Sequence, residues 1–477
     1  MAIRIVSFLL LLFFAPVVCS QNTTTPQGPW SLQQCIEYAL KTNIQLKQVQ
    51  LNAELSKVNL LQTEAGALPS VNGMMQHTYN YGRTIDQYTN TFANTTVLSQ
   101  NLYVSGSLNL FNGLQRYNTI RQNQYNYLAN KFDIEKNRND ISLNVAGAYL
   151  QILFNQELLA VAKNQLEITI KQLDRTQKLF DAGTLAKGSL LDMQAQQATD
   201  ELTIANAQNQ LDLAYLSMIQ LLNLDPANGF EIQKPELSLP LENLLINSPS
   251  QIFSQAVKNL PEVKSAELKL LGAEKGVSAA KGAISPQLSL NATYGTGYSG
   301  LSKSLISYGI SGVDTIGYTT TLQPVVAPHF VPVFENNSFS KQYKDNVNQT
   351  LGFRLTVPLF NGLQTHSSIS RAKISRMSSE LALEQTKQQL QKSIQQAYAD
   401  ANAGLKKYIA TKKAVEANEE SFKYSEQKYN VGALNVFDYN LAKTKLAKAK
   451  SDLVQAKYDF VFRSKVLDFY QGKPLTL

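Results

Sequence analysis

The chain has 477 residues, and its 44 Lys and Arg against 36 Asp and Glu give a formal net charge of +8. Charged residues make up only 17% of the chain, below the roughly 25% of an average soluble domain. The excess positive charge is spread along the sequence, with no dense run of Lys or Arg to follow a phosphate backbone. This composition excludes a disordered chain and a nucleic-acid-binding protein.

The first 20 residues have the pattern of a secretory signal peptide. Arg4 precedes an apolar run at 5–14, and cleavage is expected near Gln21. An exported protein would then keep Cys35 as its one cysteine, without an intrachain disulfide. Lipidation of Cys19 is the alternative, which the bulky valines before it disfavour. No later stretch approaches the ~18 consecutive apolar residues of a transmembrane helix, so any membrane entry would use β-strands.

The remainder of the chain is an internal duplication. The six residues Leu110–Gln115 recur letter for letter at 359–364, an offset of 249, whereas Pro69 and Pro286 correspond at an offset of 217. The difference of 32 residues is an insertion in the second half. The predicted organisation is a signal peptide (1–20), a first repeat (21–225), an equatorial linker (226–247), a second repeat (248–471) with a longer surface loop at 299–349, and a tail (472–477).

Each repeat begins with a predicted helix and a predicted strand. Residues 31–64 lack Gly and Pro and open with a capping box, Ser31-x-x-Gln34, and the counterpart at 248–283 opens with Ser248-Pro249. The hydrophobic period then becomes two, at 71–81 and 288–298, which predicts strands. The Thr-, Asn- and Ser-rich stretches that follow, 83–100 and 299–349, are predicted to be long loops.

A return strand and a long helical hairpin complete each repeat. In the second repeat Leu351, Phe353, Leu355 and Val357 alternate with other residues and form a uniformly apolar face, which we expect to contact lipid. Residues 114–180 and 363–429 are free of Pro and nearly free of Gly, so each predicts one helix of roughly 100 Å. The partner helices, 190–223 and 439–471, carry a coiled-coil heptad; its positions in the last helix are Tyr439, Leu446, Leu453, Phe460 and Leu467. The helices at 31–64 and 190–223, stacked end to end, match one long helix in length.

Four strands per chain cannot close a membrane barrel, because such barrels begin at about eight strands. Lipid-exposed strands would therefore require oligomerisation. The alternative is a soluble sheet covered by its own helices. The predicted helices are far longer than a four-stranded sheet could use, which disfavours that alternative.

These features together resemble the TolC-like outer-membrane efflux protein (outer membrane factor) family. The resemblance covers essentially the whole mature chain: the duplication, the Leu-Phe-Asn-Gly junctions between strand and helix, and the turns at 178–185 and 428–434. It implies a mainly α fold with a small β-barrel part. Long coiled-coil hairpins and four strands per chain would complete a 12-stranded barrel and an α-barrel tunnel as a homotrimer.

The resemblance also implies partners and a location. The protein would sit in the lipid of the outer membrane of a Gram-negative bacterium and extend into the periplasm. It would meet a periplasmic adaptor (membrane fusion) protein and an inner-membrane pump of the resistance-nodulation-division or ABC type. The function would be that of a passive exit duct in efflux or type I secretion, without a cofactor. A periplasmic or surface coiled-coil scaffold or adhesin without a channel is the alternative.

The two helical turns are the predicted functional positions. Gly183 and Gly432 stand where a helix must stop and reverse, which favours positive φ, and Ser189 and Asp438 are the N-cap candidates six residues later. The turns could be capped hairpins only, or adaptor-docking sites; the docking residues would be Gly183, Thr184, Leu185, Gly432, Ala433 and Leu434.

By resemblance, Asp438 belongs to a ring of acidic residues at the periplasmic gate, together with Tyr429. Three symmetry-related carboxylates would attract cations and impede anions. The family's second acidic position is Leu441 in this chain, and a position commonly held by arginine is Leu434. Ion pairs that latch the closed state are therefore not expected at these positions.

The spacing of the His, Cys and Gly residues does not fit an enzyme active site or a metal site. His77, His329 and His366 are far apart in the sequence and form no HExxH motif, and no paired cysteines accompany them. Gly295-x-Gly297-x-x-Gly300 matches a dinucleotide-binding pattern by letter but leads into a Ser-rich stretch rather than a helix. We expect no catalytic residue and no metal site.

Overall fold

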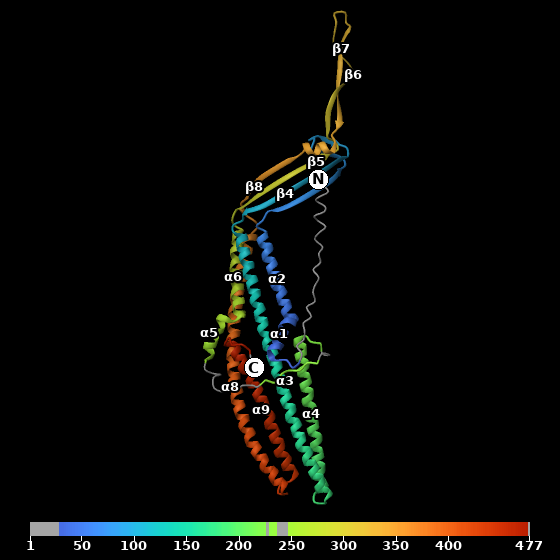
Figure 1. The fold of residues 1–477 in the computed structure, drawn as a ribbon. Coiled ribbons are helices and arrows are strands. Elements are labelled where there is room, and N and C mark those ends of the chain that lie inside the picture. Colours follow the sequence, from blue (N-terminus) through green and yellow to red (C-terminus); the bar gives the residue numbers. More distant parts are fainter. Residues whose placement is uncertain (1–27, 226–228, 236–246, 476–477) are drawn as a thin grey trace. The chain divides into compact units, whose positions relative to one another are not determined.

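The computed structural model describes residues 28–225, 229–235 and 247–475 (Figure 1). The predicted signal peptide and most of the predicted linker lie outside these residues. The described residues form two compact units: those within Met1–Ile44, Arg138–Ile252 and Ile394–Leu477 form one, and those within Gln45–Asn137 and Phe253–Ser393 form the other. Each unit takes segments from both repeats, so the duplication in the sequence does not correspond to a division into two compact halves.

The elements follow the order that the duplication predicts. The first repeat contains α1 (Leu32–Thr42), α2 (Ile44–Ala65), β1 (Ser70–Asn80), β2 (Arg83–Ile85), β3 (Phe92–Asn94), β4 (Val97–Phe111), α3 (Gln115–Asp181) and α4 (Lys187–Leu222). The second contains α5 (Pro249–Asn259), α6 (Pro261–Gly282), β5 (Gln287–Ser299), β6 (Lys303–Tyr318), β7 (Pro324–Asn336), α7 (Phe339–Asp345), β8 (Asn348–Thr356), α8 (Gln364–Asn430) and α9 (Val436–Tyr470). Both α3 and α8 are uninterrupted helices of 67 residues, as predicted.

The first helix of each repeat is broken, and the prediction of one continuous helix there was wrong. The first repeat breaks at Asn43, whose ψ of 122° is not helical. The second breaks at Leu260, immediately before Pro261, which can begin a helix but cannot donate within one. The two breaks lie at equivalent positions, because Asn43 and Leu260 are separated by the same offset of 217 that relates Pro69 to Pro286.

The repeated Leu-Phe-Asn-Gly-Leu-Gln motif forms the junction between a strand and a long helix. Its Gly and the following Leu both have positive φ: 64° and 61° at Gly113 and Leu114, and 60° and 64° at Gly362 and Leu363. A Cβ at Gly113 would collide with the Gly282 carbonyl oxygen. The motif thus recurs because both repeats need the same left-handed pair of residues to turn from strand into helix.

Four strands form one antiparallel sheet in the order β1-β4-β5-β8, in which β4 and β5 join the two repeats. β8 ends at Thr356, so Val357 lies just beyond the strand rather than within it. Pro358 supplies no N–H to continue the ladder, which is consistent with this end.

The stretches predicted as long loops contain regular structure. In the second repeat, β6 and β7 form a long two-stranded hairpin, and the short helix α7 follows it. In the first repeat, β2 and β3 form a small hairpin, and β4 already begins at Val97. The prediction of loops at 83–100 and 299–349 was therefore wrong over most of both ranges.

The heptad seam of α9 is largely buried. Tyr439, Leu446, Phe460 and Leu467 are buried on this seam, whereas Leu453 is half-buried. The equivalent seam of α4 buries Leu190, Leu211 and Met218. The coiled-coil pattern therefore correctly located contacts of α4 and α9. Both helices belong to the compact unit that contains Arg138–Ile252 and Ile394–Leu477, which we call the helical unit.

Among the described residues, α3 is the one helix whose length and composition would suffice to cross a membrane. Its most apolar window has a mean hydropathy of 1.2 and is 50% buried inside the fold, as the core helix of a globular bundle also would be.

Candidate functional site

The turn between α3 and α4 is closed by backbone hydrogen bonds around a left-handed glycine. Gly183 has a φ of 72°, and its N–H donates to the Phe180 carbonyl at 2.8 Å. Thr184 donates to the Leu179 carbonyl twice, from its N–H at 3.0 Å and from its hydroxyl at 2.8 Å. This arrangement satisfies carbonyl groups that the end of α3 would otherwise leave unpaired. Gly183 and Thr184 are exposed, and Leu185 is half-buried.

The turn between α8 and α9 repeats this geometry. Gly432 has a φ of 80°, its N–H donates to the Tyr429 carbonyl at 3.1 Å, and the Ala433 N–H donates to the Lys428 carbonyl at 2.8 Å. Gly432 and Ala433 are exposed, whereas Leu434 packs against the buried cluster of Phe422, Tyr439 and Leu446. Both turns belong to the helical unit and lie at the same end of its bundle (Figure 1).

The predicted N-caps were wrong, because the N-cap position of each helix lies three residues before the candidate. Asn435 caps α9: its side-chain oxygen accepts from the Asp438 N–H at 2.8 Å, and its amide nitrogen donates to Asp438 Oδ2 at 2.9 Å. Asp438 therefore lies in the first turn of α9, exposed, where the helix dipole favours its negative charge. α4 begins after Ala186, which makes no side-chain cap, so Ser189 caps nothing there.

Tyr429 is packed inside its hairpin and does not join Asp438. Its ring stacks on that of Tyr439, with the centroids 4.6 Å apart, and its hydroxyl is buried without a hydrogen-bond partner. Burial raises the pKa of Tyr439 above its usual value. Of the two predicted gate residues, Asp438 therefore has an exposed carboxylate, whereas the ring of Tyr429 is half-buried.

A bidentate contact links the two hairpins near their turns. Arg175 on α3 donates from Nη2 to the Asn430 carbonyl at 2.8 Å, and from Nη1 to the Asn430 side chain. Asn430 is the last residue of α8, where the final carbonyl groups lack helical partners. The contact therefore joins the end of one hairpin to the other through a charged donor.

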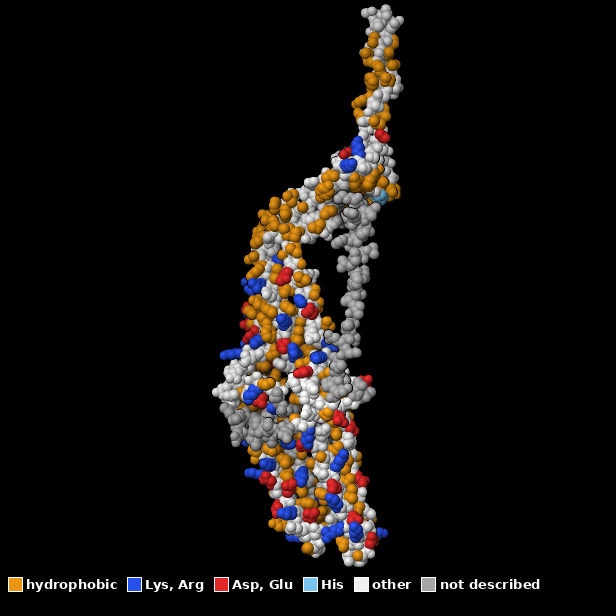
Figure 2. Space-filling model, viewed as in Figure 1, with side chains coloured by type: hydrophobic (Ala, Val, Ile, Leu, Met, Phe, Trp, Pro, Cys, Tyr) orange, Lys and Arg blue, Asp and Glu red, His pale blue; other side chains and the backbone are white. Residues whose placement is uncertain are grey.

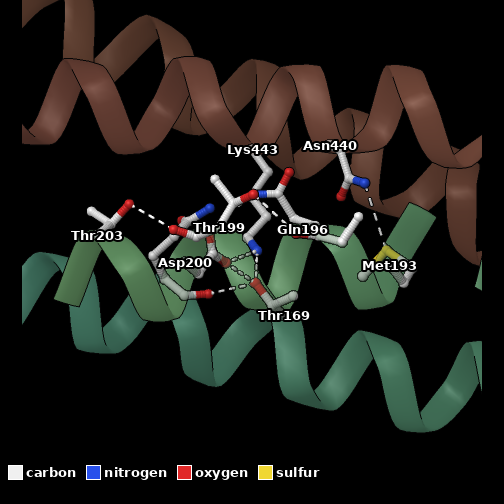
Figure 3. A network of polar contacts seen from close by, with 10 residues as sticks. Thr169, Met193, Gln196, Thr199, Asp200, Thr203, Asn440 and Lys443 are labelled. Carbon is white, nitrogen blue, oxygen red and sulfur yellow. Dashed lines mark hydrogen bonds and ion pairs between the residues drawn. The ribbon is translucent and has the colours of Figure 1, made fainter. Parts of the chain in front are cut away.

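A buried polar network connects three helices further along the bundle (Figure 3). Lys443 Nζ on α9 lies 3.2 Å from Asp200 Oδ2 on α4, and only 2% and 7% of the two side chains are exposed. The Thr169 hydroxyl on α3 contacts both groups, and Gln196 donates to Asp200 Oδ1 at 2.8 Å. Burial lowers the pKa of Lys443, while the Asp200 carboxylate acts in the opposite direction.

The sequence patterns did not predict this network, although one signal for it is present in α4. Asp200 follows Met193 and precedes Ala207 at intervals of seven residues, and all three are buried on α4. An acidic residue at a core position of a heptad needs a buried partner. The partner, Lys443, lies 243 residues away in the sequence, so spacing alone could not identify it.

The four-stranded sheet has one apolar and one polar face. Cross-strand partners share a face, and the register aligns Val71, Gly106, Ala292 and Leu351 across all four strands. Phe353 and Leu355 continue this face opposite Leu290 and Leu288. In the single chain Leu351, Phe353, Leu355 and Val357 are 72, 70, 65 and 50% exposed. The other face carries polar residues, among them Asn72, Ser105, Thr293 and Thr350.

Within the described residues, no group of three or more His, Cys, Asp or Glu side chains is placed to hold a metal ion.

A family model described as "Outer membrane efflux protein" matches residues 35–224 and 252–472. The chain is 26% identical over 328 residues to the outer membrane protein TolC of Escherichia coli (strain K12), covering 67% of this chain and 58% of TolC. It is 20% identical over 462 residues to the outer membrane efflux protein BepC of Brucella suis biovar 1, covering 95% and 88% of the two chains. The matched part thus spans less than two thirds of TolC.

Solved structures share the fold. A crystal structure of CusC superposes with a TM-score of 0.76 at 17% identity, covering 95% of this chain and 96% of CusC. The crystal structure of the outer membrane protein VceC from Vibrio cholerae gives a TM-score of 0.75 at 15% identity, covering 93% and 97%.

The family match covers most of both repeats, and the fold agrees with it over nearly the whole chain. The chain therefore belongs to the outer membrane efflux protein family, the TolC-like channel proteins, which are not enzymes, and it is an outer-membrane protein of a Gram-negative bacterium.

Proposed function

We propose that three copies of this chain form the passive outer-membrane exit duct of a tripartite efflux or type I secretion system. Cargo would enter from a periplasmic adaptor protein and an inner-membrane pump of the resistance-nodulation-division or ABC type. The observation that carries this proposal is the four-stranded sheet, which has one apolar face, one polar face and two open edges.

The open edges argue for closure by other copies. Among the described residues, β1 and β8 each pair on one side only. In a lipid environment unpaired backbone groups cost several kcal/mol each, on the order estimated for buried amides, so the edges must find partners. Three copies would supply 12 strands, with β1 of one copy beside β8 of the next. The face of Leu351, Phe353 and Leu355 would then contact lipid, and Thr350 and Arg354 would face a polar lumen.

The helical hairpins supply the remainder of the duct in this proposal. Their turns expose backbone and small side chains at Gly183, Thr184, Gly432 and Ala433, which another protein could approach closely. We place adaptor docking at these residues together with Leu185 and Leu434. The Arg175–Asn430 contact supports this assignment, because it holds the two turns of one chain together as a single surface.

In the proposed gate, Asp438 supplies the negative charge. Its carboxylate is exposed, and one oxygen accepts from Asn435, which leaves its charge free to act on a pore. Three-fold symmetry would bring three such charges together. Tyr429 would act indirectly, by packing against Tyr439 and so supporting the first turn of α9.

The experiment that tests the duct places a charge on each face of one strand. In the proposed barrel, Phe353→Arg puts a guanidinium into lipid and should cost about 2–4 kcal/mol near the bilayer midplane, so heat-resistant oligomer in outer membranes should be lost. The matched control, Thr350→Arg, places the same group on the polar face of β8 and should assemble normally. Normal assembly of Phe353→Arg, or equal loss in both variants, would contradict a lipid-facing strand.

A further inference from the structure

The hairpin of β6 and β7 takes no part in the proposed duct or gate. It belongs to the insertion that makes the second repeat longer, and its strands have 16 and 13 residues. Neither strand pairs with the four-stranded sheet. A two-stranded hairpin alone is marginally stable in water. Some further contact must therefore stabilise it.

Hydrophobic side chains occur along much of this hairpin (Figure 2), and most residues of one face are apolar. The register pairs Leu305 with Phe334, Ile310 with Phe330 and Val313 with Pro328, and because the β7 partners are spaced by even numbers they share a face. We call this the hairpin face; it includes Leu305, Tyr308, Ile310, Val313, Phe330 and Phe334. In the single chain Ile310 is 65% and Phe330 59% exposed.

The opposite face carries smaller side chains, among them Val325, Val331 and Val333, and it holds the charged residue of this range. It pairs Gly309 with Val331, Gly312 with His329 and Asp314 with Ala327. Asp314 is the one Asp, Glu, Lys or Arg between Leu305 and Phe334, and its carboxylate lies 2.5 Å from His329 Nδ1 on this same face. The hairpin face consequently carries no charge over this range.

The edges of the hairpin do not favour strand addition. β7 contains Pro324, Pro328 and Pro332, and a proline within a ladder is tolerated where its missing N–H would face away from the paired strand. The outer edge of β7 therefore lacks three backbone N–H groups. Prolines of this kind protect a strand edge against pairing with a strand of another molecule. The register of β6 shifts three times, as bulges do, which twists that strand. A partner would therefore cover the face rather than extend the sheet.

The base of the hairpin is held by specific hydrogen bonds. Asn337 donates from its N–H to the Ser302 carbonyl and from its side chain to the Ser302 hydroxyl, both at 2.9 Å. The buried Gln342 of α7 donates to the Asn337 and Ser299 carbonyls, each at 3.0 Å. These contacts fix the hairpin to the end of β5. Because the hairpin is already ordered, less conformational entropy is lost when its face packs against a partner.

We propose that the hairpin faces of the three copies pack against one another beyond the end of the barrel. This rests on the proposed trimer, in which each copy would present one hairpin from the end of the same strand. Symmetry brings like residues together, so a charged face would repel its copies, whereas an uncharged face of Ile310 and Phe330 would not. Packing of these side chains removes apolar surface from water.

Cysteine cross-linking in outer membranes tests this packing. Phe330→Cys places a thiol on the hairpin face, and Val331→Cys places one on the opposite face at the next residue of the same strand. Native Cys35 is fully buried, and the parent chain gives the background. On oxidation, Phe330→Cys should form a covalent dimer of this chain, while Val331→Cys should remain at background. Ile310→Cys is a second probe of the same face and should behave like Phe330→Cys.

The native mass of the same samples separates the two proposals. A trimer in which neither Phe330→Cys nor Ile310→Cys cross-links overturns the packing alone. Equal cross-linking at Val331→Cys, or an adduct with a different protein, also overturns it. Absence of the trimer would overturn the proposed function as well.

Discussion

Lys443 of α9 and Asp200 of α4 form an ion pair in the interior of the helical unit, with Nζ 3.2 Å from Oδ2 and both side chains almost fully buried. The Thr169 hydroxyl of α3 completes the contact, so one network joins the α3–α4 hairpin to the final helix. Because α9 belongs to the other hairpin, any separation of the two hairpins at this level would have to break the pair.

Removing one member of this pair should be strongly destabilising. Lys443→Met leaves the Asp200 carboxylate buried without a cation, which we expect to cost about 3–5 kcal/mol. Lys445→Met, on an exposed position of the same helix, should change stability by no more than about 0.5 kcal/mol. Thermal loss of helical circular dichroism at fixed protein concentration measures both.

The double variant Lys443→Met/Asp200→Leu should recover much of that loss, because replacing both charges with apolar groups removes the unpaired one. A melting temperature of Lys443→Met equal to that of the parent would show that the pair does not contribute to stability.

The turn glycines should matter for docking rather than for insertion. A Cβ at Gly183 or Gly432 meets no atom within 4 Å, so the cost of Val arises from the positive φ alone, on the order of 1–2 kcal/mol per turn. We expect Gly183→Val/Gly432→Val to reduce cross-linking to the adaptor while the barrel still inserts. Gly188→Val, in the first turn of α4 without positive φ, is the control. Undiminished adaptor capture by the double variant would leave the turns as capped hairpins only.

Asp438→Asn tests the gate. Asn435 is the cap of α9, and Asp438 contributes its backbone N–H to that cap, which Asn retains. The helix should therefore remain intact while three negative charges disappear from the pore, so cation preference and block by multivalent cations in planar bilayers should both fall. Asp181→Asn removes an exposed acid from the other turn and should leave both unchanged. Identical ion selectivity of the parent and Asp438→Asn would show that Asp438 has no role in the gate.

Long-period features of this fold could be predicted from the sequence. The absence of Pro and near-absence of Gly located α3 and α8 to within a residue, and the repeated Gly183 and Gly432 located both turns. Alternation predicted the strands of the sheet, because half of each strand is apolar. The N-cap of α9 could not be predicted from the sequence. Asn435 and Asp438 are three residues apart, and both residue types are good N-caps, so residue type does not distinguish them.

The hairpin and the buried ion pair could not be predicted for physical reasons. The register shifts of β6 interrupt its period of two, and the prolines of β7 imitate a loop although they occupy permitted ladder positions.

The break at Asn43 has no proline to signal it, whereas Pro261 could have signalled the equivalent break. The pairing of Asp200 with Lys443 depends on the packing of two hairpins, which no local pattern encodes.

The number of chains in the native particle tests the central claim most directly. Four strands with two open edges per chain require three copies for a 12-stranded barrel. Native mass spectrometry of the protein extracted from outer membranes in mild detergent should give a particle of three chains. A monomer, or a particle of two or four chains, would contradict the proposed duct.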